Sequence, residues 1–268
     1  MTPKTPVLLK RFALVAMGSG LVLACGARVA GADAAPAPEP EKKPKWETSA
    51  GVGVTLTAGN SESVLATANF LTQYKRDKDE FRFTADAGYG EAKPMESATN
   101  PDPEMEKNTA YVRGSAQYNR LFSERLYGYL RVDAIHDDVA DVTYRVMLSP
   151  GVGYYFIKNA KTQLSAELGP GYVFEKLDDD ENDYATLRIA ERFEHKLSKT
   201  ARLWQSVEIL PEVSDFENYL VNFTAGIEAD ITKKLRVQVY VLDTYDNVPA
   251  PGRDQNDLKL VAGLKYVF

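Results

Sequence analysis

Acid–base chemistry in this chain would have to come from few residues, because its 268 residues include two histidines and one cysteine. His136 is followed directly by Asp137 and Asp138, and a carboxylate beside an imidazole can prepare it to act as a general base. Ser149 is the best available hydroxyl for the nucleophile of such a pair. One of two histidines near an acid is unsurprising, however, so we expect that the chain is not an enzyme. A hydrolase acting on lipid or peptide is kept as an alternative.

A run of acidic residues, DDDEND at 178–183, could hold a divalent cation through its carboxylate oxygens. It lacks the glycine-centred spacing of a calcium loop, so we interpret it as a solvated loop. Bridging through divalent cations to lipopolysaccharide phosphates is a second interpretation. The glycine-rich stretches 151–153 and 169–171 are not phosphate-binding loops, because no helix is expected after them. The sequence therefore indicates no metal ion and no cofactor.

Charged residues of both signs recur on one face of segments whose other face is apolar. They are Glu47, Arg82, Asp86, Arg113, Arg131, Asp133, Arg145, Glu167, Arg188, Arg192, Glu194, Glu208, Glu228, Asp230, Arg236, Lys259 and Lys265. An Arg or Lys facing the middle of a bilayer costs about 2 to 4 kcal/mol, so we predict that these residues line the interior of a barrel. There they could set the selectivity of a polar pore, or pair across strands and fill a narrow interior. We favour a filled or narrowly conducting interior over a wide channel.

The segments that carry these charges alternate apolar and polar residues from Trp46 to Phe268. The stretch 219–231 reads YLVNFTAGIEADI, and the stretch 257–268 reads DLKLVAGLKYVF. A period of two belongs to β-strands, and the segments are as long as the roughly 9 to 11 residues with which a tilted strand crosses a bilayer. We therefore predict an all-β fold, an antiparallel up-and-down transmembrane β-barrel of about 12 strands. Its closed hydrogen-bond ladder would stabilise it without a packed apolar core.

The connections between these segments alternate in kind along the chain. One set is short and basic, at residues 75–78, 123–125, 158–161, 198–202 and 232–234. The other set is mostly longer and acidic, at residues 91–107, 137–142, 178–183, 214–218 and 246–256, with 59–61 as a short member. Short turns on one rim and longer loops on the other are typical of outer-membrane barrels. With the N-terminus in the periplasm, the acidic loops would face outward and Phe268 would end at the periplasmic rim.

Aromatic residues fall where the two edges of a membrane belt should be, and aromatic rings favour such interfaces. The periplasmic set is Trp46, Tyr74, Phe81, Phe122, Phe156 and Phe268, and the outer set is Tyr89, Tyr144, Phe174, Tyr219 and Tyr245. A soluble periplasmic barrel that binds a ligand inside would instead need a polar outer face. The off-pattern residues that favour this alternative are Glu191, His195 and Gln205, in two adjacent segments.

The first 34 residues have the layout of a cleaved export signal. A basic stretch precedes the apolar residues 12–24, and small residues follow. The single cysteine, Cys25, falls inside this signal, and VLAC at its position also resembles a lipobox that would lipidate it. Residues 35–45 are rich in proline and charge and are interpreted as a linker, which leaves 46–268 for the barrel. The formal net charge of -6 argues against nucleic acid as a partner.

Several motifs resemble those of a known family. They are Trp46 with GVG at 51–53 and TAGNS at 57–61, PGVGY at 150–154, GPGY at 169–172, YDNVP at 245–249, Asp257, and the terminal YVF at 266–268. In this order they resemble the YdiY-like, salt-induced outer-membrane proteins, a family of unknown function. The resemblance implies a barrel in the outer membrane of a Gram-negative bacterium, and no activity. The terminal Phe268 also resembles the signal read by the barrel-assembly machinery, so we expect that machinery, membrane lipid and lipopolysaccharide as partners.

Overall fold

The computed structural model describes residues 45–57, 63–94 and 104–268. The predicted signal peptide of residues 1–34, with Cys25, lies outside the described residues, and so does the predicted linker up to residue 44. In the described part of the chain, no helix is long and apolar enough to cross a bilayer.

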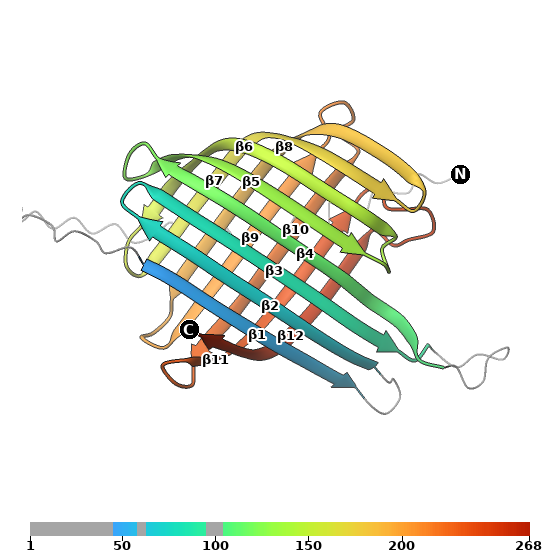
Figure 1. The fold of residues 1–268 in the computed structure, drawn as a ribbon, viewed down its shortest axis with the longest axis horizontal. Coiled ribbons are helices and arrows are strands. Elements are labelled where there is room, and N and C mark those ends of the chain that lie inside the picture. The colour runs from blue at the N-terminus through green and yellow to red at the C-terminus, as the bar shows by residue number, and fades with distance from the viewer. Residues whose placement is uncertain (1–44, 58–62, 95–103) are drawn as a thin grey trace, which may run out of the picture. The chain divides into compact units, whose positions relative to one another are not determined.

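Twelve β-strands make up the regular structure of the described residues. They are β1 Lys45–Thr57, β2 Ser63–Arg76, β3 Asp79–Ala92, β4 Glu106–Leu121, β5 Leu126–Asp137, β6 Val142–Lys158, β7 Thr162–Leu177, β8 Asp180–Lys196, β9 Ala201–Pro211, β10 Tyr219–Asp230, β11 Leu235–Asp246 and β12 Asn256–Val267. Each strand pairs antiparallel with the next, and β12 returns to pair with β1, which closes the sheet into a barrel (Figure 1). The predicted all-β fold, an antiparallel up-and-down barrel, is confirmed. Closure removes the free sheet edges, so backbone groups can pair around the whole wall.

The two ends of the barrel differ in how they join the strands. At the turn end, on the left in Figure 1, the connections are residues 77–78, 122–125, 159–161, 197–200 and 231–234. The chain also leaves the barrel there, where the amide of Phe268 donates to the carbonyl of Thr48 at 3.0 Å. At the opposite loop end, the connections within the described residues include 138–141, 178–179, 212–218 and 247–255. The predicted longer loops are found at 212–218 and 247–255, whereas 138–141 is no longer than the turns 122–125, 197–200 and 231–234, and 178–179 is shorter.

The shortest connection at the loop end lies in the acidic run at 178–183, which was predicted to be a loop. That prediction is wrong, because β7 continues to Leu177, β8 begins at Asp180, and Asp178 and Asp179 alone join them. Asp178 adopts a φ of 52°, in the left-handed region that Asp tolerates and that tight hairpins need. The rest of the run pairs across the hairpin as strand, with Asn182 opposite Glu175. Within the described residues, no group of acidic, His or Cys side chains could hold a metal ion.

Four connections at the turn end share one local device. A side-chain oxygen near the start of each turn accepts a hydrogen bond from the amide three residues later, at 2.8 to 3.0 Å. The residues that accept are Ser123, Asn159, Ser198 and Thr232. Ser, Thr and Asn favour turns because their short side chains satisfy backbone N–H groups in this way. These residues therefore set the places at which successive strands reverse.

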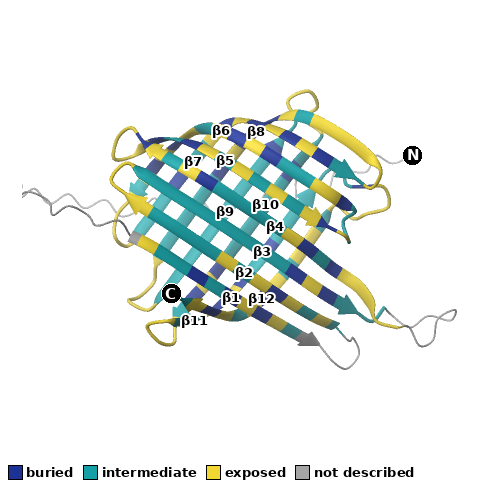
Figure 2. Ribbon diagram, viewed as in Figure 1, coloured by how far each residue is buried: buried dark blue, intermediate teal, exposed yellow. Residues whose placement is uncertain are grey.

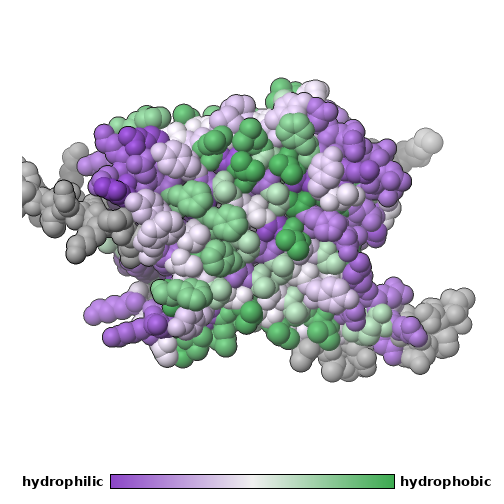
Figure 3. Space-filling model, in the orientation of Figure 1, coloured by the Kyte–Doolittle hydropathy of each residue, from purple (hydrophilic) through white to green (hydrophobic). Residues whose placement is uncertain are grey.

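The outer face of the barrel is apolar across its middle. Figure 3 shows apolar side chains gathered over the centre of the visible wall, with polar side chains toward both ends. The exposed outer residues include Val52, Val112, Leu130, Leu168, Ile227 and Leu260. Figure 2 shows exposed and less exposed positions alternating along several strands. Aromatic pairs lie near the edges of this zone, such as Trp46 with Tyr74, whose ring centroids are 4.9 Å apart.

Candidate functional site

Contacts that cross the barrel identify its inner face. Arg145 on β6 binds Asp246 on β11 at 2.9 Å, and Arg131 on β5 lies 3.9 Å from Glu208 on β9. Side chains on strands that are not neighbours can meet in this way only inside the barrel. Strand alternation then places the other members of each strand on the inner or outer face.

The candidate residues all lie on this inner face, according to the strand register. They are Arg82, Asp86, Arg113, Arg131, Asp133, Arg145, Glu167, Arg188, Arg192, Glu208, Glu228, Arg236 and Lys259. Inside the barrel they belong to three groups: a central network, a cluster toward the turn end, and a cavity at the loop end.

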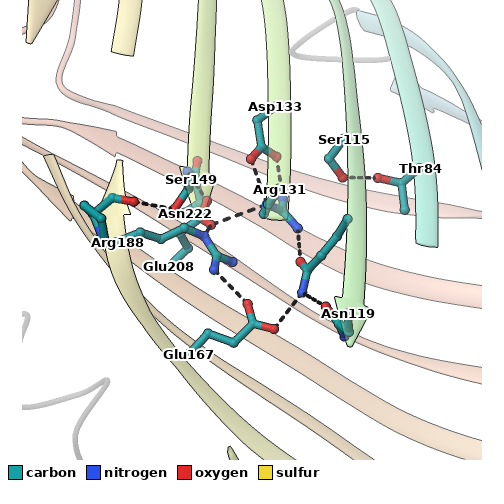
Figure 4. A network of polar contacts seen from close by, with 12 residues as sticks. Thr84, Ser115, Asn119, Arg131, Asp133, Ser149, Glu167, Arg188, Glu208 and Asn222 are labelled. Carbon is teal, nitrogen blue, oxygen red and sulfur yellow. Dashed lines mark hydrogen bonds and ion pairs between the residues drawn. The ribbon is translucent and has the colours of Figure 1, made fainter. Parts of the chain in front are cut away.

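The central network is centred on Arg188, which lies between two carboxylates (Figure 4). Its guanidinium donates to Glu208 at 2.6 Å and to Glu167 at 2.7 Å. Arg131 donates to Asp133 at 2.5 and 2.7 Å. Because each charge has a partner of opposite sign, the network can be buried without an isolated charge.

Neutral side chains connect the two halves of this network. The amide of Gln117 donates to Glu167 at 2.7 Å, and its oxygen accepts from Arg131 at 3.2 Å. The hydroxyl of Tyr127 also donates to Glu167, at 2.8 Å. Glu167 thus accepts from a guanidinium, an amide and a phenol, which satisfies the carboxylate and fixes its position.

Apolar side chains pack on the same side of the interior, contrary to the expectation of a barrel without an apolar core. One cluster holds Leu121, Tyr127, Tyr129 and Tyr155, and another holds Met147, Val173, Leu210 and Leu220. Gly153 makes room for the first cluster, since a Cβ there would lie 2.2 Å from the ring of Tyr127. The inner side of β5 to β10 is therefore filled by both ion pairs and packed rings.

Toward the turn end, three cations surround one carboxylate. Glu228 accepts from Arg202 at 2.6 Å, from Lys265 at 2.9 Å and from Arg236 at 3.0 Å. The Glu228 side chain is 2% exposed. Arg236 also binds Asp230 at 2.7 Å, so this cluster ties β9, β10, β11 and β12 together.

A cavity of about 220 Å³ lies at the loop end. Its lining includes Tyr111, Arg113, Arg145, Asp246, Arg253 and Lys259. Arg145 binds both Glu175 and Asp246, and Arg253 binds Asp141 on a neighbouring loop. The cavity therefore brings charges of both signs from several strands to one mouth of the barrel.

The inner side of β1 to β4 carries several small side chains. Its inward residues include the small or neutral Ser49, Gly51, Gly53, Thr67, Asn69, Thr84 and Ser115. Asp86 and Arg113 there are 29% and 28% exposed, although both point into the barrel. Arg131 and Asp133 in the central network are 20% and 26% exposed, so water can reach inward charged groups on both sides of the interior.

The predicted catalytic pair is not brought together. His136 is on the outer face of β5 near the loop end, where its ring nitrogens contact the Thr143 carbonyl and Asp138, each at 2.9 Å. Ser149 is on the inner face of β6, is 0% exposed, and donates to the carbonyl of Pro170 at 3.0 Å. The barrel wall separates the two side chains, so they cannot act on one substrate. The expectation that the chain is not an enzyme stays a prediction.

Sequence reasoning missed three residues that complete the interior. Arg202 was assigned to a basic turn, and Glu175 and Asp246 were placed outside the predicted inner face. The strands extend farther than expected and include all three. The alternation of side chains along a strand could have identified two of them. Glu175 is an even number of residues from the inward Glu167 in β7, and Asp246 is an even number of residues from the inward Arg236 in β11.

The fold and its interior define a class: a twelve-stranded antiparallel barrel with an apolar outer face and an ion-paired inner face. The chain belongs to the family of proteins of unknown function DUF481, which it matches over residues 50–268. No curated protein matches the chain. Family membership assigns no activity, so a function has to be argued from the barrel itself.

Among solved structures, the chain is similar to several barrels at low sequence identity. The NanC porin has 6% identity and a TM-score of 0.48, with 82% of this chain and 98% of that chain covered. The KdgM porin in complex with disordered oligogalacturonate has 8% identity and a TM-score of 0.44, covering 84% and 99%. The translocator domain of the autotransporter NalP from Neisseria meningitidis has 13% identity and a TM-score of 0.41, covering 83% and 87%.

Proposed function

We propose that this protein spans the outer membrane of a Gram-negative bacterium as a narrow, water-filled pore. The observation that carries the proposal is the contrast between the two faces of the barrel wall. The outer face is apolar, and the inner face carries charged side chains that water can reach. Paired charges and packed rings occupy the inner side of β5 to β10, and the passage would run along the small inward side chains of β1 to β4.

The outer face supports the membrane location. Exposed Val, Leu and Ile side chains around a closed barrel match what hydrocarbon requires, and backbone pairing around the wall leaves no edge in lipid. Aromatic residues at both edges, such as Trp46 and Phe156 near the turn end and Tyr89 and Phe174 near the loop end, fit the two interfaces. We place the turn end in the periplasm and the loop end outside, with lipid and lipopolysaccharide as neighbours.

Delivery to this membrane belongs to the same proposal. The export signal of residues 1–34 would take the chain across the inner membrane. The barrel-assembly machinery would read β12, whose outer face ends in Tyr266 and Phe268 with ring centroids 5.1 Å apart. We also infer that the chain is YdiY-like within its family, on the motifs that it shares with those proteins.

The polar residues on the outer face of β8 and β9 would favour a soluble ligand-binding barrel. Two of them satisfy each other, since the amide of Gln205 donates to Glu191 at 3.1 Å. His195 likewise lies 2.8 Å from the hydroxyl of Thr162. Local pairing of this kind lowers the cost of polar groups in lipid, so these residues do not outweigh the apolar wall.

Single-channel recording in a planar lipid bilayer tests the proposal. Purified, refolded protein is expected to give discrete conductance steps that scale with salt concentration and are smaller than those of wide porins. A folded, heat-modifiable barrel that never conducts would overturn the pore and leave a barrel with a structural role in the envelope.

A further inference from the structure

Four interior carboxylates are held by cations. Glu167 and Glu208 share Arg188, Glu194 contacts Arg192 and Arg202, and Glu228 has three partners. Their negative charge is therefore largely neutralised where it lies, and little of it is left to attract a passing cation.

Arg82 differs from these groups. It lies on the inner face of β3 between Gln73 on β2 and Gln117 on β4, both of which are neutral. Among the residues that the structure describes, Arg82 has no hydrogen-bond or ion-pair partner, and its side chain is half-buried in the interior. Its charge is thus not neutralised by a carboxylate in contact with it.

The electrostatic surroundings reinforce the charge of Arg82. The charges that act on it most strongly are those of Arg192, Glu194, Arg131 and Arg202, three cations and one carboxylate. The Arg192 side chain is 39% exposed, so it also faces water. Cations therefore outnumber carboxylates among the charged groups that act on Arg82.

The loop end provides a second cation without a carboxylate. The ammonium of Lys259 lies 5.2 Å from the centroid of the Tyr111 ring, and Arg113 lies 5.3 Å from the same ring. Within the described residues, Lys259 contacts no carboxylate, and Arg113 is 3.9 Å from Asp86. Asp257, which has no ion-pair partner among the described residues, also lines this cavity, so the mouth is mixed in charge and the discrimination falls to Arg82.

From this distribution we infer that the passage prefers small anions, inorganic ions and carboxylates among them, and that Arg82 sets the preference. The inference rests on the proposed pore and names its solute class. By Coulomb's law in water, a unit charge about 6 Å away changes the local concentration of a monovalent ion about threefold, upward for an anion and downward for a cation. Loss of Arg82 is therefore expected to lower the chloride-to-potassium permeability ratio by about threefold to tenfold at low salt.

The test is the reversal potential in a planar bilayer under a KCl gradient, for wild type, Arg82→Gln, Arg82→Lys and Arg120→Gln. Wild type is expected to prefer chloride, R82Q to lose most of the preference, and R82K, which keeps the charge, to retain it. R120Q is the matched control, because Arg120 is exposed on the outer face of β4 and pairs with Asp79. Screening predicts a smaller effect in 1 M than in 0.1 M salt.

The outcomes separate the two claims. A wild-type protein that conducts without preference, or prefers potassium, overturns the anion inference and leaves the pore. An R82Q protein with the wild-type ratio overturns the role of Arg82. A wild-type protein that inserts and never conducts overturns the pore itself. Because Arg82 has no partner to lose, R82Q is expected to fold, and heat modifiability checks this.

Discussion

Glu228→Gln should be among the most destabilising single polar substitutions in the barrel. Glu228 binds Arg202, Arg236 and Lys265. Arg202 retains Glu194 at 3.8 Å and Arg236 retains Asp230, but Lys265 contacts no other carboxylate within the described residues and its side chain is 9% exposed. The substitution thus leaves the buried ammonium of Lys265 without an ionic partner. Breaking a buried pair in this way costs about 3 to 5 kcal/mol.

A second substitution distinguishes the cost of the unpaired Lys265 ammonium from other effects of removing the Glu228 carboxylate. In Glu228→Gln with Lys265→Met, the unpaired ammonium is gone, and replacing both members of a buried pair is often close to neutral. We expect the double variant to recover at least about 2 kcal/mol of the lost free energy of unfolding, because residues 228 and 265 are in contact and their substitutions are not additive. Asp230→Asn is the control, because Asp230 is more exposed and Arg236 keeps Glu228, so its cost should stay under about 1 kcal/mol.

The assay is urea unfolding in lipid vesicles, followed by tryptophan fluorescence and by heat-modifiable migration. The chain has two tryptophans, and Trp204 lies on the inner face, packed against a cluster that includes Tyr240. The reasoning is refuted if E228Q unfolds within about 1 kcal/mol of wild type, or if the double variant is as unstable as the single one.

Two further predictions concern packing and the loop end. Gly153→Ala should destabilise the barrel by about 1 to 3 kcal/mol, because the added Cβ would clash with Tyr127. Gly114→Ala is the control and should change the stability by less than about 1 kcal/mol, since the nearest atom to its added Cβ is 3.5 Å away. Equal unfolding midpoints for the two variants would contradict the packing around Tyr127. The hydrogen bond from Arg253 holds the pKa of the Asp141 carboxyl below its usual range, so this link between two loops is present at neutral pH and is lost as pH falls through the lowered value. The protection of amides in loops 138–141 and 247–255, corrected for their slower intrinsic exchange at acid pH, should fall at acid pH in wild type, and Asp141→Asn should show that fall at neutral pH. Protection that is independent of both changes would contradict the link.

Alternation accounts for what the sequence could predict. A period of two over a dozen segments was enough for the barrel class, because each strand needs one face for the exterior and one for the interior. The same parity assigned Arg188 and Glu208 to one face from the residues alone. It failed at 178–183, where acidity suggested a loop but the chain turns at Asp178 and Asp179 and resumes its pairing.

The alternation of residues along a strand does not predict which side chains meet across the barrel. Arg145 and Asp246 are 101 residues apart and on strands that are not neighbours, so their contact depends on the curvature and closure of the sheet. The packed rings of Tyr127 and Tyr155 were missed for a related reason. An aromatic residue at an inward position fits a wet lumen wall as well as a packed cluster, and only the opposite wall decides between them.

Labelling of single cysteines in intact cells tests the central claim most directly, since the only native cysteine is Cys25, in the predicted signal. A charged, membrane-impermeant thiol reagent should label Ser115→Cys, on the inner face among the small side chains of β1 to β4. It should not label Ala116→Cys, the neighbour that faces lipid, nor Ser149→Cys, on the filled side. Labelling of S115C alone is the predicted result. Labelling of A116C would contradict the membrane-facing wall, and an unlabelled S115C in a folded barrel would contradict the water-filled passage.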